Sequence, residues 1–132
     1  MALVALALSS CRSDRGSHSR SIVQSFRAFQ DASESDKQPA LASLRAAKCD
    51  DAPTCADRDA CIDYAVALLR AGELAKKARA LGPEDAGGNG VATREELALI
   101  IQGADDALRV AEAADGKCRA ALARLTERSS RP

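Results

Sequence analysis

The most regular pattern of apolar and polar positions lies in the last third of the chain. Apolar residues recur there with alternating steps of four and three, which is the heptad spacing of a helical seam. The seam positions are Leu97, Ile101, Ala104, Leu108, Ala111, Asp115, Cys118, Leu122 and Leu125. Thr93 and Glu96 form a capping box in front of this seam. The pattern therefore predicts one helix from Thr93 to about Arg128, in which Asp115 sets register or meets a basic residue of a partner helix.

A second long helix is predicted upstream of this seam. Thr54 is placed to cap it, Asp57 suits its first turn, and Gly82-Pro83 is a typical stop just after Leu81. Its expected inner face consists of Cys61, Tyr64, Leu68, Ala71, Ala75 and Ala78. Because alanines permit close approach, we expect the two long helices to form an antiparallel hairpin.

Two shorter helices are predicted before this hairpin. In the segment 21–33, Ile22, Phe26 and Phe29 fall on one face of a helix. A further helix is expected to begin near Pro39 and to end near Lys48. Both would cover one side of the hairpin. The predicted fold is therefore all-α, a three- or four-helix bundle over residues 21–132 with a long antiparallel helical hairpin.

The start of the chain carries a different signal. Leu8-Ser9-Ser10-Cys11 closes the apolar run 1–7, and polar residues follow at once. This arrangement resembles the lipobox of bacterial lipoprotein signal peptides. The resemblance implies that residues 1–10 are a signal peptide and that Cys11 receives a diacylglycerol group. No Lys or Arg precedes Cys11, so we expect the signal to be truncated or the true start to lie upstream. Residues 11–20 would then be the lipidated cysteine and a flexible tether.

The resemblance also carries an expectation about location. In that family, a residue other than Asp after the cysteine implies retention in the outer membrane, and Arg12 fits this rule. A lipid-anchored protein of the bacterial cell envelope, facing the periplasm, is therefore expected, with the membrane and an envelope protein as its partners. The alternative is an apolar N-terminus that packs onto a cytosolic domain.

The remaining cysteines predict covalent cross-links. With Cys11 lipidated, an even number is left in a small exported domain: Cys49, Cys55, Cys61 and Cys118. Such a set is typical of two disulfides, and it lacks the close spacing of a zinc site. Cys61 and Cys118 both lie on inner faces of the hairpin, which favours a bridge between them. Cys49 would then reach Cys55 across the turn. Counting helical rise instead favours Cys55 with Cys118, leaving Cys49 for Cys61, and both pairings stay open.

The segment from Asp85 to Glu96 resembles the calcium-binding loop of an EF-hand. It matches most of the pattern D-x-[DN]-x-[DN]-G-x5-E, but Gly87 stands at the third position, where a ligand is expected. The resemblance implies a calcium site whose ligands are Asp85, Asn89, Val91, Thr93 and Glu96. A glycine-rich hinge followed by a capping box gives much of the same pattern without a metal. The sequence is compatible with both interpretations.

Composition narrows the remaining classes of function. The 132 residues suit one domain, their formal net charge is zero and aromatic residues make up only 2%. Without a basic stripe or stacking aromatics, nucleic-acid binding is not expected. We expect the single histidine, His18, to be solvated, and no nucleophile–base pair is visible, so neither an enzyme nor a small-molecule substrate is expected. The sequence predicts a structural or protein-interaction module, with a calcium-responsive helical module as the alternative.

Overall fold

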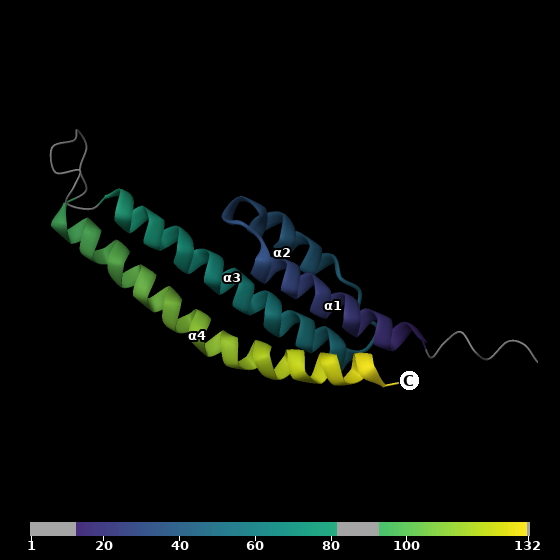
Figure 1. Cartoon of the computed structure of the whole chain (residues 1–132). Coiled ribbons are helices and arrows are strands. Elements are labelled where there is room, and N and C mark those ends of the chain that lie inside the picture. Colours follow the sequence, from purple (N-terminus) through teal and green to yellow (C-terminus); the bar gives the residue numbers. More distant parts are fainter. Residues whose placement is uncertain (1–12, 82–92, 132) are drawn as a thin grey trace, which may run out of the picture.

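The computed structural model describes residues 13–81 and 93–131, and these form a four-helix bundle of unequal helices (Figure 1). The elements in chain order are α1 (Ser13–Asp31), the short 3-10 helix η1 (Glu34–Asp36), α2 (Lys37–Ala46), α3 (Ala52–Ala80) and α4 (Arg94–Ser130). The described residues contain no strand. The predicted all-α class is therefore confirmed.

The helices run alternately up and down, and each packs mainly on its neighbours around the bundle. The largest interface joins α3 to α4, α1 lies against α2 and α4, and α2 lies against α3 (Figure 1). α3 and α4 thus form the long antiparallel hairpin that the two apolar patterns predicted. α4 has 37 residues, about 55 Å at the usual helical rise, and it curves along α3 without a break at Gly103 or Gly116.

The core lies in the half of the molecule where all four helices run together. α1 contributes Ile22, Phe26 and Phe29, and these side chains are almost completely buried. The ring of Tyr64 from α3 lies 6.1 Å from that of Phe26. The other core residues are Val23 of α1 and, from α2 with its C-cap, α3 and α4, Leu41, Leu44, Ala47, Cys61, Ala65, Cys118, Ala121 and Leu125. Both phenylalanines of the chain therefore fill this one core, which otherwise consists of small and aliphatic side chains.

The first turns of α1 correct the expectation of a flexible tether. Residues 13–20 are helical, so the tether prediction is wrong for them. Ser19 is fully buried, and the Arg20 side chain donates a hydrogen bond to the backbone carbonyl of Ser129 at 3.2 Å. Gly16 lies so close to the end of α4 that an added Cβ would be 3.6 Å from the Arg128 carbonyl oxygen. Packing against α4 thus outweighs the low helix propensity of this serine-rich segment.

His18 is also placed differently from the expectation. Its side chain is only 21% exposed, and Nδ1 lies 2.7 Å from Oδ2 of Asp50. The contact has the length of an ion pair but not the angular geometry of a hydrogen bond. The prediction of a solvated histidine is wrong because α1 begins early enough to bring it against the α2–α3 connection.

Helix ends follow local chemistry with small shifts from the predicted positions. α3 is capped by Asp51 rather than Thr54, because the Asp51 side chain accepts a hydrogen bond from the backbone N–H of Thr54 at 2.8 Å. Pro53 lies in the first turn, where its missing N–H is not needed. α2 likewise begins at Lys37, just before Pro39, rather than at the proline itself.

Both disulfides lie beside the core. Cys49 pairs with Cys55 across the α2–α3 turn, and Cys61 pairs with Cys118 between α3 and α4. The structure therefore contains the pairing favoured by the inner-face positions and not the one favoured by counting helical rise. α2 and the α3–α4 hairpin are thus fastened at the same end of the molecule.

Candidate protein-interaction surface

The two long helices extend beyond the ends of α1 and α2 (Figure 1). In this part of the hairpin, residues 72–81 (the end of α3 and its cap) and 93–106 (the cap and first turns of α4) include no buried residue. They nevertheless carry large aliphatic side chains: Leu74, Leu81, Leu97, Leu99, Ile100 and Ile101. We call the side of residues 68–81 and 93–110 that carries Leu68, Ile101 and Leu108 the hairpin surface.

The predicted seam of α4 is therefore buried over only part of its length. Ala111, Cys118 and Leu125 are buried as expected, but Ile101 is 46% exposed and Leu108 is 48% exposed. Two packed helices cover only one side of each other, so a third layer is needed to enclose a full apolar stripe. α1 and α2 provide that layer at one end of the hairpin and are too short to provide it at the other.

An apolar groove of about 550 Å³ lies where this cover ends. Its floor is made of small residues of both long helices, Ala71, Gly72 and Ala75 from α3 and Ala104 from α4. Leucines stand along its sides: Leu68, Leu69 and Leu108. Residues of η1 and α2 also line the groove: Glu34, Lys37 and Gln38. The groove is thus the continuation of the bundle core past the ends of the two short helices.

The basic side chains at the groove are already engaged. Lys37 Nζ donates hydrogen bonds to the backbone carbonyls of Phe29 at 2.6 Å and Gln30 at 2.9 Å, and it lies 4.8 Å from the centre of the Phe29 ring. Lys76 forms an ion pair with Glu34. The carboxylates of Glu73 and Asp105 also line the groove. No hydrogen bond or ion pair joins either of them to another of the described residues. The uncompensated charge of the groove is therefore negative.

A second hollow, of about 430 Å³, lies on the other face of the hairpin. Val110 lines it and is 61% exposed. Leu108 and Val110 are about 200° apart around a helix, so the two hollows face opposite directions. The other lining residues are Ala67, Arg70, Leu74, Gly103, Asp106 and Ala107. Val110 and Asp106 therefore provide matched control positions for tests of the groove.

The half of the molecule that contains the two disulfides is called the stapled half below. It holds a charged cluster that was not foreseen from the sequence. Asp57 is only 6% exposed, and its carboxylate meets Arg124 and Arg128 of α4. Arg128 also donates a hydrogen bond to the buried hydroxyl of Thr54 at 3.3 Å. The hydrogen bond and the charge of Asp57 raise the pKa of Arg124 above its ordinary value. One signal was available, because Asp57 lies seven residues before Tyr64 and so shares its position in the inner-face repeat.

The polar seam position, Asp115, pairs within its own helix. Its carboxylate lies 2.8 Å from the Arg119 guanidinium, one turn further along α4. The expectation of a basic partner on a facing helix is not met, because an i,i+4 arginine on the same helix is within easier reach.

Several predicted site residues lie outside the described residues. These are the lipidation candidate Cys11 and the calcium-ligand candidates Asp85, Asn89 and Val91. Thr93 and Glu96 are described, and they form the predicted capping box. Thr93 Oγ1 accepts from the Glu96 backbone N–H at 3.2 Å, and a Glu96 carboxylate oxygen accepts from the Thr93 N–H at 3.0 Å. Within residues 13–81 and 93–131, no group of three or more His, Cys, Asp or Glu side chains is placed to hold a metal ion.

No helix of the described part combines the length and the apolar character that crossing a membrane requires. Comparison with known proteins found no matching family model, no similar curated sequence and no similar solved structure.

Proposed function

We propose that this protein is a lipid-anchored component of the bacterial cell envelope and that its helical domain binds another protein through the hairpin surface. One observation carries the binding role: a long stretch of the hairpin displays leucine and isoleucine without burying any residue. Covering such a side chain completely is worth about 1.5–3 kcal/mol, so this surface gains free energy when a partner packs on it. Contiguous apolar patches on small domains typically mark interaction sites.

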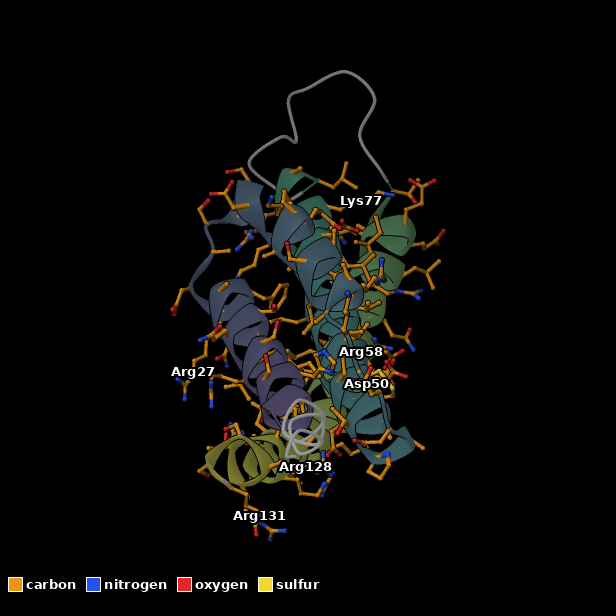
Figure 2. The ribbon with its side chains drawn as sticks, turned by 90° about the vertical axis from the view of Figure 1, so that its right-hand side faces the viewer. Arg27, Asp50, Arg58, Lys77, Arg128 and Arg131 are labelled. Carbon is orange, nitrogen blue, oxygen red and sulfur yellow. A yellow bond between two sulfur atoms is a disulfide. The ribbon has the colours of Figure 1, made fainter. Side chains whose placement is uncertain are left out.

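The anchor is supported by the resemblance of Leu8-Ser9-Ser10-Cys11 to a lipobox. α1 begins at Ser13, two positions after Cys11, and its first turns lie at the same end of the molecule as the end of α4 (Figure 1). Figure 2 shows Lys77, near the end of α3, at the opposite end from Arg128. An anchor at Cys11 therefore holds the stapled half near the membrane and directs the hairpin surface away from it, where a partner can reach it.

The anchor is tested by labelling with a fatty-acid analogue in a bacterium that processes lipoproteins. The wild-type chain should carry the label and fractionate with membranes, whereas Cys11→Ser should do neither. Equal labelling of the two chains would show that Cys11 is not the lipidation site.

The binding role is tested by placing a photo-crosslinking amino acid at single positions of α4 in cells. Leu108 lies in the groove, and Ala123 is an exposed residue of the same helix in the stapled half. We expect a discrete cross-linked adduct from position 108 and none from position 123. If position 108 yields no more adduct than position 123, the hairpin surface is not an interaction site.

A further inference from the structure

We propose that the groove between α3 and α4 binds an amphipathic helix of a partner protein that carries Lys or Arg beside its apolar stripe. The inference rests on the proposed function, because it specifies what occupies the surface assigned there. It depends on three features of the groove: its shape, its lining and its charge.

The shape fits a helix. In an up-and-down bundle, the groove is the place that longer versions of α1 and α2 would fill. The small side chains of Gly72, Ala75 and Ala104 leave room for a helix backbone to approach closely. An added Cβ at Gly72 would meet nothing within 4 Å, so this part of the floor is open.

The lining fits the apolar stripe of such a helix. Leu68 and Ala75 line the groove seven residues apart on α3. On α4, Leu108 lines the groove, and Ile101 precedes it by the same spacing on the same side of the helix. Each spacing covers about two helical turns, roughly 10 Å. A helix lying along the groove would therefore contact it through three apolar positions spaced i, i+3 or i+4, and i+7, which is the usual pattern of helix-in-groove recognition.

The charge fits basic rather than acidic flanks. Lys37 and Lys76 are held by the carbonyls of α1 and by Glu34, so they are not free to pair with a ligand. Glu73 on α3 and Asp105 on α4 have no such partner among the described residues. Lys or Arg on the two sides of a bound helix would pair with these carboxylates, whereas Glu or Asp there would be repelled.

The test uses two fluorescent model peptides with the same stripe of leucines, one with lysine and one with glutamate at the flanking positions. Binding to the oxidised full chain is followed by fluorescence anisotropy. We expect the lysine peptide to bind and the glutamate peptide to bind at least about tenfold more weakly, since two favourable charge pairs become two unfavourable ones. Added salt should narrow that difference.

Matched variants locate the site. Leu108→Glu should abolish binding, and Glu73→Lys combined with Asp105→Lys should reverse the preference between the peptides. The controls Val110→Glu and Asp106→Lys lie at the opposite hollow and should leave both affinities unchanged. Because all five positions are solvent-exposed, circular dichroism should show the same helix content in every variant.

Three results would overturn the inference: equal binding of the two peptides, binding that is insensitive to Leu108→Glu, or an equal effect of the opposite-face controls on binding.

Sedimentation equilibrium provides an independent check. A dimer that Leu108→Glu dissociates would mean that a second copy of the chain occupies the groove instead. If position 108 cross-links in cells while the peptides are not distinguished, the proposed function stands and the basic helix is wrong. If position 108 does not cross-link and the two peptides are not distinguished, the proposed function and the proposed basic helix are both wrong.

Discussion

Arg124 of α4 donates two hydrogen bonds to one carboxylate oxygen of Asp57 of α3, from Nε at 3.0 Å and from Nη2 at 2.8 Å. The other oxygen lies 2.8 Å from Nη1 of Arg128. A nearly buried carboxylate is thereby neutralised from across the helix interface, and the register of α3 against α4 is fixed beside the core.

Removing this carboxylate should therefore weaken the fold. We expect Asp57→Ala to lower the free energy of unfolding by about 1–3 kcal/mol, because buried hydrogen bonds to a charged group are lost. Urea denaturation followed by circular dichroism measures the change. The neighbouring Asp59→Ala is the control, since that side chain is 58% exposed and its loss should change stability by no more than about 0.5 kcal/mol. Equal effects of the two substitutions would contradict a structural role for the cluster.

The contribution of Arg124 should not depend on pH in ordinary buffers. Its pKa is raised in the folded state by the hydrogen bond and charge of Asp57. A raised pKa means that the stabilisation is fully present below the unfolded value and is lost only as the pH rises past the folded one. The stability difference between wild type and Arg124→Met should therefore be the same in neutral and in mildly alkaline buffer. A difference that shrinks between these two buffers would contradict this assignment.

The two disulfides should differ in their effect on stability. Cys61–Cys118 joins residues 57 positions apart, whereas Cys49–Cys55 joins residues 6 apart. In the chain-entropy account, the first contributes about 4 kcal/mol and the second about 2 kcal/mol. Replacing each pair by alanines and measuring urea denaturation tests the order. Intact mass after alkylation without reductant should show no modified thiol among these four cysteines, and full alkylation would disprove both bridges.

Hydrogen exchange should vary strongly along α4. Amides of residues 98–106 lie where no residue is buried, whereas those of 114–125 lie beside the core and the disulfide. Local opening should therefore be much easier in the first segment, with exchange faster there by at least about tenfold. Mass spectrometry of exchanged fragments resolves the two segments. Similar protection of both in the free protein would show that the projecting hairpin is stabilised by something besides its own packing.

The capping box provides a way to separate the two interpretations of the loop before α4. Thr93→Ala should cost about 1 kcal/mol because the cap of the first turn is lost. Glu96→Gln should be nearly neutral, since a glutamine side chain also accepts in a capping box. Calorimetric titration with Ca²⁺ then decides: a calcium site gives heat in the wild type that Glu96→Gln loses, and a simple cap gives identical traces.

The parts of the fold that the sequence predicted are those governed by local periodicity. The repeat from Leu97 to Leu125 and the capping box at Thr93 located α4 to within a few residues. The inner-face positions of Cys61 and Cys118 also favoured the disulfide that the structure contains between them. Such features depend on spacing within one helix or between two adjacent ones, which the chain displays directly.

The parts that were missed depend on contacts between distant segments. The helical start of α1 is held by the end of α4, so the polar residues before Ile22 gave no sign of it. The exposure of Ile101 and Leu108 depends on how far α1 and α2 reach along the hairpin. A heptad repeat shows that a stripe is apolar, but it does not show which element covers it or whether any does.

The position of the Cys61–Cys118 bridge limits how far the hairpin can come apart. Separation of α3 from α4 that starts at their far ends can travel inward only as far as the bonded sulfur atoms. At that point the two helices stay covalently joined even when the outer part of the hairpin has unfolded. The part of the hairpin beyond the disulfide can therefore unfold and refold repeatedly while the part beside the core stays folded. Each time it refolds, the bridge returns the two helices to the same register.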